Sequence, residues 1–120
     1  MAISRTDYGP VKVVHAQGYL SGLAATELDR YLAELLAGRG PHKLVLDLAA
    51  VTEMSSAGLR AIISAAKRAR SHKGGDLRLV APNRRVTEVL ELAGLVAVIP
   101  IYSTVEEAVA SYAAPSTAQP

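Results

Sequence analysis

The sequence predicts a single α/β domain with a mixed, mostly parallel sheet of about five strands and with four helices. The chain has 120 residues, the size of one ordinary domain. Half of its residues are apolar, most of them aliphatic, which suits the packing of helices on a sheet. Segments with the apolar period of a strand alternate with segments that have the period of a helix. This alternation is typical of right-handed βαβ units and a largely parallel sheet.

The chain is expected to open with a hairpin. A short strand near 3–8 precedes Gly9-Pro10, and the segments 11–15 and 17–20 that follow have extended character. A hairpin places one antiparallel strand in the sheet, and we expect that strand at or near an edge.

The next elements are a helix and a buried strand. Leucines recur at helical spacing after a turn at 21–22, and either Ala24 or Thr26 is expected to open this helix. A glycine, Gly38, follows the last periodic residue and is typical of a helix end. The almost continuous apolar run 43–48 predicts a strand that is covered on both faces, and 49–54 is interpreted as a connection.

The second half of the chain repeats the alternation. The segment 113–120 has no apolar periodicity and contains two prolines, so it is expected to be a disordered tail that leaves 1–112 as the domain. The elements expected before it are a helix that ends at Gly74-Gly75, a strand over 77–80, a helix over about 84–93, a strand over 96–102 and a helix over 105–112 that Ser103-Thr104 caps.

Composition excludes several classes of function. The absence of cysteine excludes disulfides and thiolate metal sites, and the three histidines lack metal-ligand spacing, so no metal and no cofactor are expected. These histidines are expected at the surface or at sheet edges. A net charge of +2 does not favour nucleic acid as a partner. The longest apolar run, 92–102, is well short of the roughly 20 residues of a membrane span. Because 1–8 does not resemble a signal peptide either, a cytoplasmic protein without membrane contact is expected.

The most informative segment is the start of the second helix. Ser55 or Ser56 is expected to be its N-cap, a role in which a serine oxygen accepts a hydrogen bond from a free backbone N–H. Gly58 falls in the first turn, where glycine costs about 1 kcal/mol against alanine. We therefore expect another backbone or a partner to approach Gly58 closely.

This segment and three others together resemble a known family. They are Ser-Ser-Ala-Gly-Leu at 55–59, Gly-Tyr-Leu at 18–20, Gly-Gly-Asp-Leu-Arg-Leu at 74–79 and Glu-Leu-Ala-Gly-Leu at 91–95. In order and spacing they resemble STAS domains, the family of bacterial anti-sigma factor antagonists, over about residues 3–112.

The resemblance implies a function by partner switching. Such an antagonist binds an anti-sigma factor that is a serine kinase, and the sigma factor is released. The kinase then uses ATP to phosphorylate the antagonist, which ends the interaction. A serine phosphatase removes the phosphate and restores the antagonist. The acceptor implied here is Ser56, with Ser55 as a second candidate. A phosphate at a helix N-terminus is compatible with the fold, because the helix dipole favours an anion there.

The chain departs from the family pattern at two positions. Many members carry aspartate directly before the acceptor serine and in the turn before the first helix, and this chain carries Ser55 and Ser21 instead. Both differences remove negative charge near the acceptor.

The expected partner-binding surface surrounds Ser56. Met54 by itself is also typical of a gap-filling core residue. Arg84 and Arg85 stand at a helix N-terminus, where cations are mildly unfavourable, and are interpreted either as a solvated pair or as contacts for acidic groups of a partner. The surface is expected to include the loop 51–54, the turn 20–23 and the outward residues Arg60 and Ser64 of the second helix. The residues singled out to bind the partner are Ser21, Glu53, Met54, Ser55, Ser56, Ala57, Gly58 and Arg60.

Two other classes of function were compared with this one. An enzyme with Ser56 as nucleophile and a histidine as base is disfavoured, because the Gly-x-Ser-x-Gly elbow and any phosphate-binding glycine motif are missing. No catalytic residue is therefore assigned. A STAS module without a phosphorylation cycle, serving as a scaffold subunit of a transport or stress-signalling complex, remains the alternative.

Overall fold

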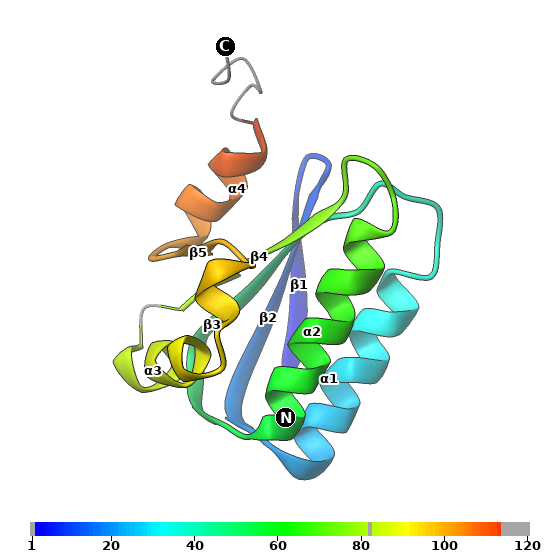
Figure 1. The fold of residues 1–120 in the computed structure, drawn as a ribbon. Coiled ribbons are helices and arrows are strands. Elements are labelled where there is room, and N and C mark those ends of the chain that lie inside the picture. Colours follow the sequence, from blue (N-terminus) through cyan, green and yellow to red (C-terminus); the bar gives the residue numbers. More distant parts are fainter. Residues whose placement is uncertain (1, 82, 114–120) are drawn as a thin grey trace.

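The computed structural model describes residues 2–81 and 83–113 (Figure 1). In this part of the chain the strands form one five-stranded sheet in the order β1-β2-β3-β4-β5. The edge strand β1 runs antiparallel to β2, and the other three pairs are parallel. This confirms the predicted mixed, mostly parallel sheet with its antiparallel strand at an edge. The strands are β1 (Ile3–Tyr8), β2 (Val11–Leu20), β3 (Lys43–Met54), β4 (Asp76–Val80) and β5 (Ile101–Tyr102).

Four α-helices occur in the described residues, as predicted, and α1 and α2 lie side by side on one face of the sheet (Figure 1). Because the strand order follows the chain order, right-handed crossovers place the connecting helices on the same face. The last helix instead follows the final strand and packs on the opposite face. The helices are α1 (Gly22–Leu35), α2 (Ser56–Arg70), α3 (Arg84–Leu92) and α4 (Val105–Ala113), with a short 3₁₀ turn η1 (Leu95–Ala97) after α3.

The sheet therefore has a larger and a smaller core. The larger core joins the inner sides of α1, α2, α3 and η1 to residues of β2, β3 and β4 such as Leu46 and Leu79, which are fully buried. The smaller core lies on the other face, where Ala108 of α4 packs with Val13, Val45 and Val80. Alternate residues of the central strands thus face different helices, which explains the nearly continuous apolar sequence of β3.

The first helix begins earlier than predicted. It starts at Gly22, and Ser21 is its N-cap residue. The Ser21 carbonyl accepts bonds from the backbone N–H groups of Ala24 and Ala25, so neither Ala24 nor Thr26 opens the helix. The backbone at Gly22 has φ +53°, a conformation that glycine adopts readily and that lets the chain turn from β2 into α1.

The predicted connection 49–54 is in fact the second half of β3. It pairs with the end of β2, where Gln17 lies opposite Ala50 and Leu20 opposite Met54. The register shifts between His15 and Gln17 and again between Gly18 and Tyr19. The segment lacks a clear strand pattern in the sequence, so the pairing with β2 is what extends it.

The last predicted strand is much shorter than 96–102. The chain leaves α3 at Gly94, whose φ of +77° ends the helix, and then forms η1. The backbone N–H of Ile99 donates to the Leu95 carbonyl, and both side chains are buried. The apolar run is therefore satisfied by one helical turn, and only Ile101–Tyr102 pairs with β4.

The end of the described chain supports the predicted cap. The Glu107 backbone N–H donates to Thr104 Oγ1 at 3.1 Å, and the Ser103 backbone N–H donates to Glu107 Oε1 at 3.2 Å. This is close to a capping box. Of the tail predicted over 113–120, Ala113 is the last residue of α4, and the rest lies outside the described residues.

One histidine contradicts the prediction that all three lie at the surface or at sheet edges. His42 is only 6% exposed, its Nε2 lies 3.0 Å from the Gly38 carbonyl, and its ring packs edge-on against His72. The chain passes inward at this point because β3 begins one residue later.

Within the described ranges no helix is long and apolar enough to span a bilayer.

Candidate partner-binding and phosphorylation site

The predicted site residues gather at the carboxyl ends of β2 and β3. These strands are neighbours and parallel, so the helices that follow them, α1 and α2, begin side by side (Figure 1). Ser21 is the N-cap residue of α1, and Ser55 is the N-cap residue of α2. Glu53 lies opposite Tyr19 in the sheet register. The fold thus brings together residues that are more than 30 positions apart in the sequence.

Ser55 has a structural role. Its backbone N–H donates to the Leu20 carbonyl at 3.0 Å, and its hydroxyl lies 3.3 Å from the same carbonyl. The hydroxyl also accepts from the Gly58 backbone N–H at 3.4 Å. Of the two serines predicted as alternatives for the N-cap, Ser55 is therefore the cap, and it ties the start of α2 to the end of β2.

Ser56 differs from its neighbour. It is the first residue of α2 and its side chain is exposed. Its hydroxyl takes part in none of the side-chain hydrogen bonds found within residues 2–81 and 83–113. A serine hydroxyl in this position is accessible to another protein, and the first-turn N–H groups of the helix favour negative charge nearby.

Gly58 lets α2 lie directly against the end of β2. A Cβ atom at this position would lie 2.7 Å from the Leu20 carbonyl oxygen and 2.9 Å from Met54 Cγ. The expected close approach is therefore made by the chain's own backbone. Met54 is half-buried and packs against the larger core, which agrees with its interpretation as a gap-filling residue.

An ion pair joins the end of β3 to the start of α3. Arg85 Nη1 lies 2.8 Å from Glu53 Oε2, with both side chains well exposed. Asn83 caps α3 through its side-chain oxygen, which accepts from the Arg85 backbone N–H at 2.8 Å. The two interpretations of the arginines from the sequence did not include this contact. Both arginines are exposed, and Arg85 is the one that pairs with Glu53.

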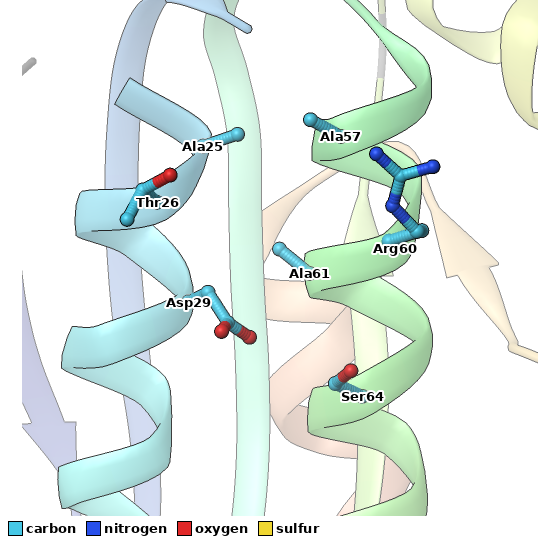
Figure 2. Close-up of a pocket in the computed structure, with 7 residues that line it drawn as sticks. All are labelled: Ala25, Thr26, Asp29, Ala57, Arg60, Ala61 and Ser64. Atoms are coloured by element: carbon cyan, nitrogen blue, oxygen red, sulfur yellow. The ribbon is translucent and has the colours of Figure 1, made fainter. Parts of the chain in front are cut away.

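A cleft of about 220 Å³ runs between α1 and α2, and Ala57, the residue after Ser56, lines it (Figure 2). Alanines on the facing sides of the two helices allow their close approach, and polar side chains stand along the rim. Asp29 on α1 and Arg60 on α2 both line the cleft without forming an ion pair. The lining residues are Ala25, Thr26, Asp29, Ala57, Arg60, Ala61 and Ser64.

Two exposed apolar side chains adjoin the predicted surface. Tyr19 at the end of β2 is 62% exposed, and Leu23 in the first turn of α1 is 75% exposed. Leu23 belongs to the turn 20–23 that was expected in this surface, whereas Tyr19 is not among the predicted binding residues. The alternation along β2 places Tyr19 on the same face as Val13, which is buried, so alternation alone does not predict that Tyr19 is exposed.

Comparisons with known proteins agree with this geometry. Residues 2–108 match the family model of the STAS domain. BtrV of Bordetella bronchiseptica, a candidate anti-sigma factor antagonist, is 33% identical over 96 residues, which cover 80% of this chain and 81% of BtrV.

Solved structures give the same result. The crystal structure of an anti-sigma factor antagonist from Mycobacterium paratuberculosis superposes with a TM-score of 0.85 and 25% identity over 93% of each chain. The phosphorylated form of SpoIIAA from Bacillus shares the fold, with a TM-score of 0.69 and 17% identity over 92% of this chain and 98% of SpoIIAA. On the family match and the relatives together, this chain belongs to the STAS domain family.

Proposed function

We propose that this chain is an anti-sigma factor antagonist that binds an anti-sigma serine kinase and that phosphorylation of Ser56 ends the binding. The names of its relatives support the general role. The observation that supports the specific proposal is that two adjacent serines have different roles in the structure. Ser55 caps the start of α2, while Ser56 presents an exposed hydroxyl that makes no side-chain hydrogen bond with the other described residues.

The chemical step belongs to the kinase. The Ser56 oxygen attacks the γ-phosphorus of ATP, a new O–P bond forms, and the bond from that phosphorus to the β,γ-bridging oxygen breaks so that ADP leaves. The hydroxyl proton passes to a base of the kinase or to water. A serine phosphatase reverses the modification by transferring the phosphoryl group to water. In this cycle the chain is a regulatory binding protein, and it requires no cofactor or metal of its own.

The modification is expected to change binding more than folding. A phosphoserine carries about −1.5 to −2 charges at pH 7. At the first residue of α2 this charge faces the free N–H groups of the helix start, which offset its cost to the fold. On the partner side the same charge meets a surface shaped for a neutral hydroxyl, and a loss of about 1.4 kcal/mol already weakens binding tenfold.

The binding surface in this proposal is centred on the start of α2. It includes an apolar anchor in Leu23 and charged groups on both sides of Ser56, and it acts in the cytoplasm without nucleic acid or membrane. Its other residues are those singled out from the sequence, namely Ser21, Glu53, Met54, Ser55, Ser56, Ala57, Gly58 and Arg60.

The test is phosphorylation by the anti-sigma kinase of the same organism. Wild type, Ser56→Ala and Ser55→Ala are incubated with the kinase and ATP, and their intact masses are measured. Wild type and Ser55→Ala should each gain one phosphoryl group, and Ser56→Ala should gain none. Equal labelling of wild type and Ser56→Ala would contradict the proposed acceptor.

Co-purification with the kinase tests the switch itself. The complex should form without ATP and dissociate when ATP is added, and Ser56→Ala should keep it intact under both conditions. A complex that survives ATP with wild type would instead support the scaffold function.

A further inference from the structure

Arg60 stands one helical turn after the proposed acceptor. Ser56 and Arg60 are both exposed residues of α2 at an i, i+4 spacing, which places two side chains on the same side of a helix about 5–6 Å apart at Cβ. Helical side chains lean toward the N-terminus, so a long side chain at position 60 reaches back over the turn that begins at 56. Figure 2 shows the Arg60 guanidinium extending in this direction, toward the turn that contains Ala57.

The guanidinium of Arg60 has no ion-pair or hydrogen-bond partner among residues 2–81 and 83–113. It is absent from the ion pairs and side-chain hydrogen bonds found in the described residues. Asp29 lines the same cleft but does not come within ion-pair distance. Arg85, by contrast, is engaged by Glu53 at 2.8 Å. Arg60 is thus an unpaired cation within one turn of the hydroxyl that is proposed to become doubly charged.

We propose that Arg60 is the internal counter-ion of phosphorylated Ser56, and that this pairing withdraws the guanidinium from the partner. The negative group lies N-terminal to the cation at i, i+4, which is the more favourable order of the two. A guanidinium can also bind two phosphate oxygens at once. In the unmodified protein the same guanidinium is free to contact an acidic group of the partner.

This mechanism adds a second effect to simple repulsion. Phosphorylation places a negative charge on the binding surface and simultaneously neutralises a positive one, so a partner that uses Arg60 loses a contact as well as meeting an anion. The inference rests on the proposed function for its biological meaning, whereas the ion pair depends only on a phosphate at position 56. Other charged groups at this end of the molecule include Glu27, Asp29 and Arg30 on α1, Glu53 on β3, and Arg84 and Arg85 on α3.

The ion pair can be measured without any partner. Full-length chain with phosphoserine at position 56, made by genetic incorporation of the modified residue, is titrated by phosphorus NMR to obtain the second pKa of the phosphate, which is ordinarily about 6. Arg60→Gln should raise this pKa by about 0.3, because an i, i+4 ion pair contributes a few tenths of a kcal/mol. Arg60→Lys should raise it less, and about 1 M salt should remove most of the difference.

Arg68→Gln is the matched control. Arg68 is also an exposed arginine of α2, but it lies 12 positions from Ser56, about 18 Å along the helix axis. It should leave the phosphate pKa almost unchanged. Equal pKa values for Arg60→Gln, Arg68→Gln and the unsubstituted phosphoprotein would overturn the proposed ion pair.

A second experiment tests whether phosphorylation withdraws Arg60 from the partner. It measures the affinity of each variant for the anti-sigma kinase in the absence of ATP. Unphosphorylated Arg60→Gln should bind several-fold more weakly than wild type, and phosphorylation should weaken it by a smaller factor than it weakens wild type. Unchanged affinity in the unphosphorylated variant would refute the withdrawal while leaving the ion pair intact. If the kinase fails to label Ser56, the proposed function fails, whereas the NMR result stands on its own.

Discussion

The two ends of the parallel strands differ in the contacts and the exposure of their residues. At the amino end Gly75 presses against the Ala69 carbonyl and the backbone of His42, and the Tyr112 hydroxyl joins β3 to β4. At the carboxyl end the helices begin close together, but Ser56 remains exposed. Both ends therefore contain close backbone contacts, at Gly75 and at Gly58, but at the carboxyl end one serine remains exposed, so the proposed phosphorylation would lie outside the core.

Gly75 at the amino end should be very sensitive to an added methyl group. Gly75→Ala would place a Cβ against the Ala69 carbonyl and near two backbone atoms of His42, none of which can move aside easily. We expect a loss of about 3 kcal/mol in the free energy of unfolding, measured by urea denaturation. Gly38→Ala is the control, because its added Cβ meets nothing within 4 Å. Similar stabilities of the two variants would show that the contact at Gly75 is relieved at little cost.

Removing the Tyr112 hydroxyl should have the next largest effect. This oxygen accepts from the Leu44 backbone N–H at 3.2 Å and can donate to the Leu44 carbonyl at 2.8 Å or the Asp76 carbonyl at 2.7 Å. Tyr112→Phe should cost about 2 kcal/mol in unfolding free energy, because partly buried backbone groups lose their partner. The ring and its contact with Arg78, 4.0 Å above it, are retained. An unchanged denaturation midpoint would show that water replaces the hydroxyl.

The same residue predicts a dependence of stability on alkaline pH. Burial, and then the Asp76 carboxylate, raise the pKa of Tyr112 far above its ordinary value near 10. Above that ordinary value the unfolded chain loses the proton while the folded chain keeps it, so stability falls as pH rises further. The decline in unfolding free energy above about pH 10 should be smaller in Tyr112→Phe than in wild type. Parallel declines would mean that other groups cause the loss.

At the carboxyl end, substitution of the two serines should affect the free energy of unfolding differently. Ser55→Ala removes the cap of α2 and the contact with the Leu20 carbonyl, and it should cost about 1 kcal/mol. Ser56→Ala should change the unfolding free energy by less than about 0.5 kcal/mol, since its hydroxyl is exposed. Thermal denaturation of both variants under one buffer condition makes the comparison. A larger loss of stability in Ser56→Ala than in Ser55→Ala would show that Ser56, and not Ser55, has the structural role.

The smallest expected effect is the coupling between Glu53 and Arg85. Both side chains are substantially exposed, and such pairs typically contribute about 0.2–1 kcal/mol. A double-mutant cycle with Glu53→Gln and Arg85→Gln should give a coupling in this range that disappears in high salt. A coupling that persists in high salt would indicate that the pair is shielded from solvent and belongs to the rigid part of the site.

Much of the fold could be predicted from local patterns. The helical spacing of leucines, the glycine after α3 and the Ser-Thr pair before α4 correspond to the observed helices and their ends. The predictions failed where another segment decides the structure. The second half of β3 is a strand because β2 extends beside it, and most of 96–102 is not a strand because Leu95 and Ile99 are buried in a helical turn.

The candidate site could be predicted in part. The family resemblance implied Ser56 as the acceptor, but the residue pattern did not show which of the two serines caps the helix, because both suit an N-cap equally. The ion pair of Glu53 with Arg85 joins residues 32 positions apart, and local periodicity carries no information about such a contact.

The sequence by itself determined the alternation of strands and helices, the class of fold and the segment that contains the proposed acceptor serine. These depend on residue type and spacing, which act over a few positions along the chain. Only the tertiary structure decided which serine ties α2 to the Leu20 carbonyl, which one remains exposed, and which arginine stays unpaired beside it. Those choices depend on distances between elements, and such distances are set when the strands pair and the helices pack.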